Sequence, residues 1–427
     1  LSVWRKFSFV YESSSEKYFA WPTACAGVSQ AILIQTNVQL ANCDFSMDFS
    51  LTAEQKEIQN LARDFTRNEI APTQLQMDED HDFPYELWRK WSQLGMAGMM
   101  IPEQYGGSGI DPLTYILALE EVATESNTFA LIWQVHVLVS EMFRKFASEE
   151  QKDYWLPIYA KGEKLAAFAL TEAGAGSDSY GMTTKAELEG NQWTINGNKI
   201  FISNAGTDIS DGTVLMAVTG TRDDGKKEIS SFIIPQDADG YTLGQSFRKM
   251  AWHGMDNREL VFEDCRIPAG NIMGERGAGL RQALGGLNLG RIAFGAIATG
   301  LIRGCLEESL VYTKERHQFG NPLSSYQLTQ AKLANMACGM ESARRLTHYA
   351  AYLFSNGLEC KKEAAMAKLF STQRSTEAAM DAFQLHGGSA FMEDTKVNRF
   401  YREAKILEIG EGTNEIQQIY IARELSR

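Results

Sequence analysis

One acidic residue near the C-terminus lies between two glycines, in the run Ile409-Gly-Glu-Gly-Thr-Asn-Glu415. Glycines on both sides allow the backbone at Glu411 to adopt unusual dihedral angles, so the carboxylate can be directed into a cavity. Desolvation there raises the pKa of a carboxyl group toward that of a useful general base. An exposed loop glutamate is the alternative, so the motif by itself predicts only a candidate proton acceptor.

Two further segments combine small or flat side chains with hydroxyls. In the run from Phe168 to Asp178, small residues let backbone amides approach a ligand, and Thr171 and Ser177 add hydroxyls. The glycine spacing does not match a dinucleotide-binding fingerprint, and a simple turn is the alternative. Phe201 and Ser203 would share one side of a strand and could face one ligand together, although a core aromatic is the favoured interpretation of Phe201 taken alone.

A third group of candidates lies in the C-terminal half. Arg316 could pair with a pyrophosphate through its two-pronged guanidinium. The pair Gly387-Gly388 would admit backbone close to a bulky cofactor, or would only end a helix.

The elements that must position these residues follow the order helical, β, helical. Thr52 and Gln55 form a plausible capping box at the start of a helix. Short strand-like runs bounded by turns follow from about residue 165, with turns expected at 189–191 and 196–198. Helix returns after about residue 274, including an amphipathic stretch from Ala364 to Leu385.

This pattern predicts an α+β fold with an N-terminal helical domain, a middle antiparallel β domain and a C-terminal four-helix-bundle-like domain. The expected limits are 47–164, 165–273 and 274–427, after a leader or extension over residues 1–46. That first segment shows no sustained periodicity, whereas Met47 and the residues after it read as a protein start.

Composition excludes several classes of protein. The formal net charge of −13 and the absence of a lysine- or arginine-rich run argue against nucleic-acid binding. The six cysteines form no C-x-x-C pair, so we expect no disulfide framework, no metal site and a reducing compartment. The longest apolar runs, such as Thr128 to Val139, are too short and too polar to span a bilayer, so no integral membrane segment is expected.

Several motifs in the same order resemble the acyl-CoA dehydrogenase family over nearly all of Met47 to Arg427. They are Pro102 to Gly109, the Thr-Glu-Ala-Gly-Ala-Gly-Ser-Asp run that begins at Thr171, Lys249-Met, Phe262 to Pro268, Glu315 to Gly320 and Glu411-Gly-Thr413. The resemblance implies FAD as cofactor and the same helical–β–helical organisation.

The resemblance also implies which residues bind FAD. The flavin segments are matched by Phe168, Leu170, Thr171, Ser177, Phe201 and Ser203. The pyrophosphate and adenosine contacts, partly across a subunit boundary, are matched by Arg316, Gln327, Gln384, Leu385, His386, Gly387 and Gly388, with Thr413 and Glu415 as final cofactor contacts. The family often has tryptophan where Phe201 stands, so stacking is retained while a hydrogen-bonding edge is lost.

For the substrate, the resemblance implies an acyl-CoA. Ser177 and Gly412 match positions near the thioester, and Asn288, Leu289 and Arg291 match the stretch that meets the CoA portion. Glu411 matches the base that removes the α-proton, while a β-hydride moves to flavin N5 and gives a trans-2-enoyl-CoA. A branch similar to isovaleryl-CoA dehydrogenase has its base at the position of Gly290, and glycine cannot accept a proton.

The remaining expectations are a short or medium acyl chain, electron-transferring flavoprotein as acceptor and a homotetramer. A bacterial cytoplasm is favoured over a mitochondrial matrix. The rival functions are an acyl-CoA oxidase that passes electrons to oxygen, and a helical protein that binds acyl-CoA without catalysis.

Overall fold

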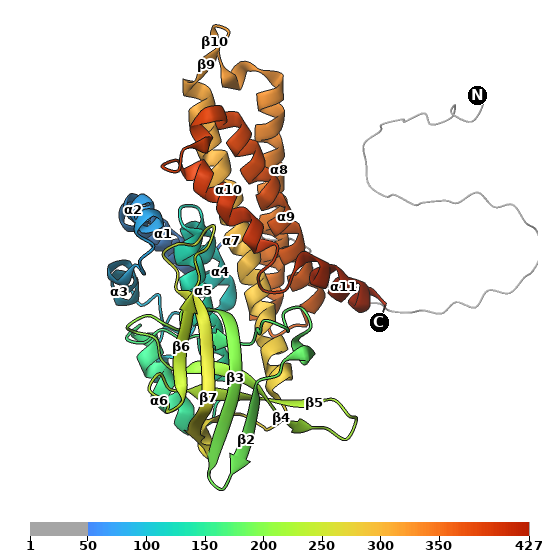
Figure 1. Ribbon diagram of the computed structural model, residues 1–427. Coiled ribbons are helices and arrows are strands. Elements are labelled where there is room, and N and C mark those ends of the chain that lie inside the picture. The colour runs from blue at the N-terminus through green and yellow to red at the C-terminus, as the bar shows by residue number, and fades with distance from the viewer. Residues whose placement is uncertain (1–49, 427) are drawn as a thin grey trace, which may run out of the picture. The chain divides into compact units, whose positions relative to one another are not determined.

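The computed structural model describes residues 50–426, which follow the predicted order of helices, sheet and helices (Figure 1). The expected extension over residues 1–46 and the start at Met47 lie outside these residues. We keep 164/165 and 273/274 as the proposed domain limits.

The N-terminal part consists of helices that pack around aromatic side chains. Its helices are α1 (Ala53–Phe65), α2 (Gln74–Asp80), α3 (Tyr85–Gln93), α4 (Pro112–Ala123), α5 (Asn127–Phe146) and α6 (Glu149–Ala160). The predicted capping box is confirmed, because the Thr52 and Gln55 side chains each bond the other's backbone N–H at 3.1 Å. Trp133 of α5 lies edge-on to Trp91 and Tyr115, with ring centroids 4.9 and 5.0 Å away, which joins α3, α4 and α5.

The middle part is an eight-stranded sheet with the order β6-β7-β3-β2-β4-β5-β8, in which β1 also pairs with β4. Its strands are β1 (Phe168–Ala169), β2 (Lys185–Glu189), β3 (Gln192–Ser203), β4 (Thr213–Thr221), β5 (Lys227–Ile234), β6 (Tyr241–Ser246), β7 (Asn257–Pro268) and β8 (Ile272–Met273). The antiparallel expectation holds for most pairs but is wrong for β1–β4 and β2–β4, which are parallel. The chain reverses at the β2–β3 hairpin and again before β4, so β4 runs in the direction of β2.

Two details of the sheet differ from the sequence expectation. The expected turn at 196–198 is a β-bulge inside the continuous strand β3, where the register with β7 shifts between Ile195 and Gly197. Glycine is required at the bulge, because φ is +145° and a Cβ on Gly197 would lie 2.7 Å from the Thr184 Cα. Strand β2 gives no alternating hydrophobic signal, since Ala186 alone among its side chains is buried.

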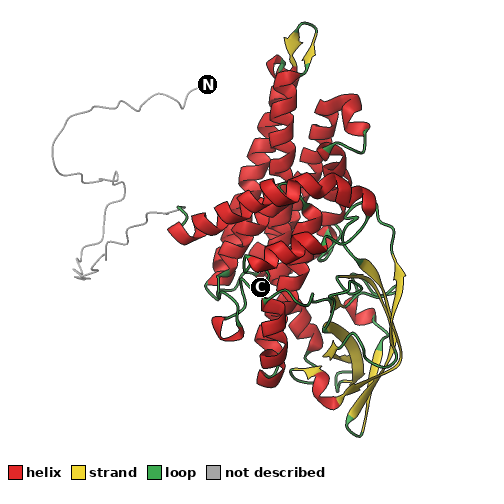
Figure 2. Ribbon diagram, turned by 90° about the vertical axis from the view of Figure 1, so that its left-hand side faces the viewer, coloured by secondary structure: helices red, strands yellow, loops and turns green. Residues whose placement is uncertain are grey.

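The C-terminal part consists of α7 (Gly279–Glu315), α8 (Gln327–Ser355), α9 (Lys361–His386), α10 (Lys396–Leu407) and α11 (Asn414–Leu425). A two-residue strand pair, β9 (His317–Gln318) with β10 (Asn321–Pro322), lies at one tip of these helices (Figure 1). Figure 2 shows the strands of the middle sheet gathered on one side of the helices, apart from the pair at the tip. The amphipathic stretch predicted over 364–385 lies within α9, as expected.

Helix α7 is the central element of the fold, and its apolar stretch is longer than the apolar runs predicted from the sequence. By length and composition alone it could cross a bilayer, the one such helix among residues 50–426, with a mean hydropathy of 1.4 over its apolar window. However, 94% of that window is buried against other parts of the protein, as in the core helix of a globular fold.

Helices α4 and α7 approach each other closely at Gly300. A Cβ placed on Gly300 would lie 2.6 Å from both the Ala123 Cβ and the Glu120 carbonyl oxygen of α4. The Glu120 oxygen is a backbone atom and the Ala123 Cβ is bonded to the backbone, so neither can move without shifting helix α4. The absence of a side chain at residue 300 therefore sets the distance between these two helices.

We expect Gly300→Ala to lower the free energy of unfolding by about 1–3 kcal/mol, since the added methyl group forces α4 and α7 apart. Gly339→Ala on α8 is the matched control, because its Cβ would meet only the Arg374 side chain, at 3.6 Å or more. That variant should gain about 0.5–1 kcal/mol from reduced backbone entropy in the unfolded chain. Urea denaturation of both variants measures this, and a Gly300→Ala protein as stable as the parent would contradict the close crossing.

Candidate active site

A short loop between α10 and α11 carries Glu411, and hydrogen bonds close it at its base. The Asn414 N–H donates to the Glu408 carbonyl oxygen at 2.9 Å. The Thr413 hydroxyl accepts the Ile416 N–H at 3.3 Å and so caps α11. The Gln417 amide donates to the carbonyl oxygens of Glu411 and Gly412, at 3.3 and 2.9 Å. The loop conformation is thus determined by contacts from both of its ends.

Glu411 adopts a left-handed backbone conformation, with φ of +56°, which is unfavourable for a residue with a side chain. Its Oε1 is buried and has no hydrogen-bond partner among the described residues. This carboxylate lies against Gly290 of α7, where a Cβ would be 1.6 Å from Glu411 Oε1. A side chain at position 290 would therefore clash with the Glu411 carboxylate. Because residue 290 is glycine, this space is open to Glu411.

Burial raises the pKa of Glu411 to about 7, although the positive charges of Arg291 and Lys368 oppose this shift. The group can thus exchange a proton near neutral pH.

Tyr115 of α4 is a neighbour of Glu411 that was not predicted from the sequence, because a tyrosine in an apolar helix resembles an ordinary core residue. Its hydroxyl is buried without a partner in the described chain. Burial, and then the charge of Glu411, raise the pKa of Tyr115.

The stretch expected to meet CoA is placed beside Glu411 rather than on an open surface. Arg291 is 3% exposed, donates to Asn288 Oδ1 at 3.1 Å, and lies over the Tyr420 ring at 4.5 Å. Its Nε is buried without a partner among residues 50–426. Leu289 packs into the apolar core. Arg291 therefore provides positive charge within the site, and Leu289 provides packing.

On the sheet side, a buried ion pair anchors the loop that carries Ser177. The Lys199 ammonium donates to Glu172 Oε1 at 2.8 Å and to the Leu170 carbonyl oxygen at 3.0 Å. The Glu172 carboxylate also accepts the N–H groups of Thr183 and Thr184, at 2.7 and 3.0 Å. Burial opposes ionisation of Glu172, but the bonds from Lys199 and Thr184 outweigh it and lower its pKa to about 2.

The ion pair closes the base of this loop, while its tip remains accessible. Ser177 is exposed, and a Cβ on Gly174 or Gly176 would meet nothing within 4 Å. Thr171 and the side chains of Phe168 and Leu170 are partly buried. Phe168 and Leu170 pack in one apolar cluster with residues 280 and 283 of α7, about two turns before the residues beside Glu411. The matched flavin segment and Glu411 thus lie near the first half of the same helix, about two turns apart.

Phe201 and Ser203 lie at the end of β3, with Phe201 in a left-handed conformation (φ +60°) and 59% exposed. The core-aromatic alternative is therefore wrong. The Asn257 amide donates to the Phe201 carbonyl oxygen and to Ser203 Oγ, at 2.9 and 3.2 Å. The Phe247 ring lies 5.2 Å from that of Phe201, so two aromatic rings present an apolar surface beside a hydroxyl.

The remaining cofactor candidates lie at the other end of the helices. Arg316 follows α7, Gln327 begins α8, and the segment 384–388 ends α9, where Gly387 caps the helix with φ of +58°. Leu385 packs on the core, and His386 stacks on Tyr312 at 4.2 Å. Lys368 near Glu411 precedes Gln384 by 16 residues on α9, which corresponds to roughly 24 Å of helix. Within one chain, the residues at this end of the helices therefore lie far from Glu411.

The groups that surround Glu411 and the exposed groups of the sheet fit a flavin cofactor. Phe201 offers an exposed aromatic face, and the Gly174–Gly176 segment leaves backbone accessible to a ligand. Buried polar atoms without protein partners in the described chain, namely Glu411 Oε1 and Asn414 Nδ2, mark places where a ligand atom can complete the hydrogen bonding. Glu415 is exposed in the first turn of α11, close in sequence to these atoms.

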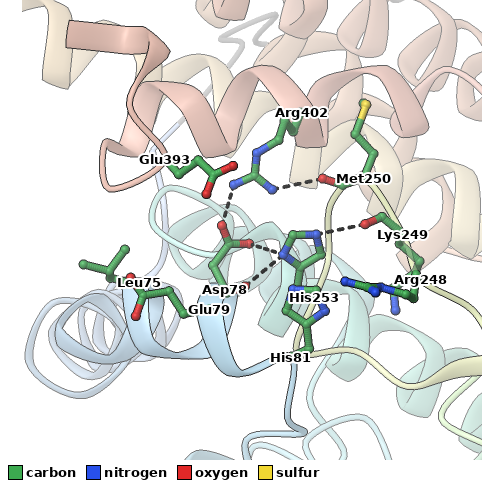
Figure 3. Close-up of a pocket in the computed structure, with 10 residues that line it drawn as sticks. All are labelled: Leu75, Asp78, Glu79, His81, Arg248, Lys249, Met250, His253, Glu393 and Arg402. Carbon is green, nitrogen blue, oxygen red and sulfur yellow. Dashed lines mark hydrogen bonds and ion pairs between the residues drawn. The ribbon is translucent and has the colours of Figure 1, made fainter.

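A separate pocket of about 460 Å³ lies between α2, α10 and the segment 248–253 (Figure 3). Asp78 accepts from His253 Nδ1 at 3.0 Å and from Arg402, and His81 stacks on His253 at 4.0 Å. None of the predicted site residues lines this pocket. Acidic and basic side chains both line it, and none of them belongs to the site around Glu411.

Metal binding has no structural support within residues 50–426, since no group of three His, Cys, Asp or Glu side chains there is placed to hold an ion. Cys265, Cys305, Cys338 and Cys360 are free thiols.

Comparison with known proteins covers almost all of the described chain. The acyl-CoA dehydrogenase N-terminal, middle and C-terminal domain families match residues 52–163, 167–265 and 277–426. Probable acyl-CoA dehydrogenase YngJ of Bacillus subtilis is 42% identical over 380 residues, which is 89% of this chain and 100% of the relative. The short-chain specific acyl-CoA dehydrogenase of Clostridium acetobutylicum is 40% identical over 382 residues, 89% of this chain and 100% of that protein.

Solved structures agree with the sequence matches. Butyryl-CoA dehydrogenase from Megasphaera elsdenii superposes with a TM-score of 0.86 at 37% identity, covering 89% of this chain and 100% of that one. A chain in a structure described as the electron transferring flavoprotein of Acidaminococcus fermentans gives the same values. The helical–β–helical architecture and the FAD cofactor are those of this family, whose members include bacterial and mitochondrial proteins. The chain therefore belongs to the acyl-CoA dehydrogenase family, a group of FAD-dependent oxidoreductases, and is close to its short-chain specific members.

Proposed function

We propose that this chain removes an α-proton and a β-hydride from a short-chain acyl-CoA thioester, giving the trans-2-enoyl-CoA, with Glu411 as the base. The observation that carries the proposal is the buried Oε1 of the Glu411 carboxylate, which lacks a hydrogen-bond partner among residues 50–426 and lies against Gly290; the pKa of this group is raised to about 7. A base with a pKa near the working pH is the most effective proton acceptor. Bound FAD supplies the hydride acceptor.

The side chains around Glu411 have distinct tasks in this proposal. The left-handed backbone and the neighbouring Gly290 direct the carboxylate into the site. The Arg291 charge favours the ionised form of Glu411, which must be present before proton transfer. The amide of Glu411 is the proposed donor to the thioester carbonyl oxygen, because the developing enolate needs a hydrogen bond at that atom. Ser177, Asn288 and Gly412 are proposed substrate contacts.

Assembly and partners belong to the same proposal. Residues 384–388 lie at least roughly 24 Å along α9 from Lys368, and Arg316 lies roughly 39 Å along α7 from Gly290. The proposed contacts of these residues and of Gln327 with FAD would therefore be made across a subunit boundary. We therefore propose the homotetramer expected from the family resemblance, with electron-transferring flavoprotein as acceptor. The similarity to a chain of the Acidaminococcus fermentans structure supports this acceptor. A bacterial cytoplasm is the proposed location, supported by relatives from Bacillus and Clostridium.

We expect Glu411→Gln to retain the flavin absorbance and the binding of butyryl-CoA, while the rate of flavin reduction by this substrate falls at least ~10³-fold. The amide has nearly the same shape as the carboxylate but cannot accept the proton. Anaerobic stopped-flow measurement of flavin bleaching tests this. Glu393→Gln, in the separate pocket, is the control and should reduce flavin at the parent rate. A Glu411→Gln enzyme that bleaches flavin at a near-normal rate would show that another residue is the base.

The raised pKa of Glu411 also predicts how stability depends on pH. The folded protein binds this proton more tightly than the unfolded chain, because the pKa is about 7 in the folded protein against an ordinary value of 4.5 for a glutamate in water. Stability contributed by Glu411 is then complete below pH 4.5 and is lost as pH rises to 7. Glu411→Gln should thus be roughly 3 kcal/mol more stable than the parent at about pH 8 and equally stable near pH 4. Urea denaturation at both pH values, with FAD in excess, measures the difference in free energy of unfolding. If Glu411→Gln were more stable than the parent at about pH 4 but not at about pH 8, the pKa of Glu411 would be lowered by folding and not raised.

The substrate and acceptor can be tested together. Across butyryl-, octanoyl- and palmitoyl-CoA, we expect kcat/KM to be greatest for butyryl-CoA, because the similar proteins include a short-chain specific acyl-CoA dehydrogenase and a butyryl-CoA dehydrogenase. The reduced enzyme should be reoxidised by electron-transferring flavoprotein much faster than by oxygen. Rapid reoxidation by oxygen alone, with hydrogen peroxide as product, would identify an oxidase instead.

A further inference from the structure

Lys368 is a fully buried lysine on α9 whose ammonium group is directed at the base of the Glu411 loop. Its side chain is 0% exposed, and Nζ donates to the Glu408 carbonyl oxygen at 3.0 Å and to Asn414 Oδ1 at 2.9 Å. The Thr372 hydroxyl, one helical turn along α9, donates to the same Asn414 oxygen at 3.1 Å. Helix α9 therefore contacts both ends of the loop through one cation.

These contacts close the loop around Glu411. Glu408 precedes the loop and Asn414 follows it, and the Asn414 N–H bonds to the same Glu408 carbonyl oxygen that accepts from Lys368. The residues between them contain Glu411 with its unfavourable left-handed backbone. A strained backbone conformation persists only where the surrounding contacts hold it in place. The hydrogen bonds from Lys368 to Glu408 and Asn414 are among these contacts.

Within residues 50–426, the charge of Lys368 is not neutralised by a carboxylate in direct contact. Its two hydrogen-bond acceptors there are a carbonyl oxygen and a side-chain amide oxygen. The charged groups that face it are Glu411, Glu408 and Glu415, which stabilise the ammonium form, and Arg291, which opposes it. Burial dominates and lowers the pKa of Lys368 to about 7. Proton transfer to Glu411 thus takes place close to an ammonium that is hydrogen-bonded to neutral oxygens.

We propose that Lys368 is a positioning residue for the reaction, which holds the Glu411 loop through Glu408 and Asn414 and favours the proton-accepting form of the Glu411 carboxylate. The inference rests on the proposed function of Glu411. It assigns Lys368 two separable effects, one geometric and one electrostatic. A purely structural lysine would have only the first.

The test compares Lys368→Met, which removes donor and charge, with Lys368→Arg, which retains both. Flavin reduction by butyryl-CoA is followed against pH in the FAD-loaded enzyme, together with flavin content and thermal unfolding. The rate rises with pH as Glu411 loses its proton. Removing the positive charge raises the pKa of Glu411, so Lys368→Met should move this rise to higher pH by about one unit and lower the rate at about pH 7 roughly 5-fold. Lys368→Arg, which keeps the positive charge over this pH range, should not move the rise to higher pH.

Lys362→Met is the matched control, because Lys362 lies on the same helix, is 38% exposed and pairs with Glu363. It should leave both the rate and the pH profile unchanged. If Lys368→Met has the parent rate and the parent pH profile, the inference is wrong. It is also wrong if this variant only unfolds at lower temperature, with the rise at the parent pH.

Asn414→Asp decides the matter if Lys368→Met does not fold. In this variant the introduced carboxylate would still accept from the Lys368 ammonium, but its negative charge would neutralise that of the ammonium. The pKa of Glu411 should therefore rise, and the increase of rate should again move to higher pH. An unmoved rise would overturn the inference. Glu411→Gln separates this result from the proposed function: if that variant stays active, the proposed base is wrong, whereas an inactive Glu411→Gln with a parent-like Lys368→Met rejects the role of Lys368 alone.

Discussion

The burial of the Glu411 carboxylate without a hydrogen-bond donor is the constraint on which the rest of the site depends. Transferring an ionised carboxylate from water into a protein interior is costly unless donors or opposite charges compensate. Here Oε1 has no partner among residues 50–426, and the compensating charges of Arg291 and Lys368 act without contacting it in a hydrogen bond. The result is a group whose proton is held near neutral pH, instead of one that stays permanently ionised.

Glu172 shows what the same side chain does when it is satisfied. It is also buried, but it accepts from Lys199 and from two backbone N–H groups, and its pKa is lowered to about 2. A carboxylate in that state anchors a loop and does not accept protons at neutral pH. The difference between the two glutamates lies in the number of donors around them, which follows from the packing of distant segments.

Helix α7 connects the two sides of the site. Gly290 on α7 leaves space for the Glu411 carboxylate, and Arg291 contributes charge. The start of the same helix belongs to the apolar cluster against which Phe168 and Leu170 of the sheet domain pack. Arg316 follows the far end of α7, Gln327 begins α8, and residues 384–388 lie at the end of α9, roughly 24 Å along that helix from Lys368. This arrangement favours a site completed by a second copy of the chain, as the proposed homotetramer requires.

The order of the elements, the capped start of α1 and the amphipathic α9 could be predicted from the sequence, because each depends on residues close together in the chain. The motif around Glu411 could be recognised for the same reason. The parallel pairing of β4, the bulge at Gly197 and the exposed ring of Phe201 could not, since they depend on which distant strands meet.

Neither could Lys368 and Tyr115 be assigned to the site from the sequence, because each resembles an ordinary helix residue in its local pattern. By itself the sequence determined the family to which this protein belongs and the candidate site residues, through the side chains and their spacing. The tertiary structure alone decided which of those side chains lose water and which charges face them, because burial and electrostatic neighbours arise only when segments far apart in the chain pack together.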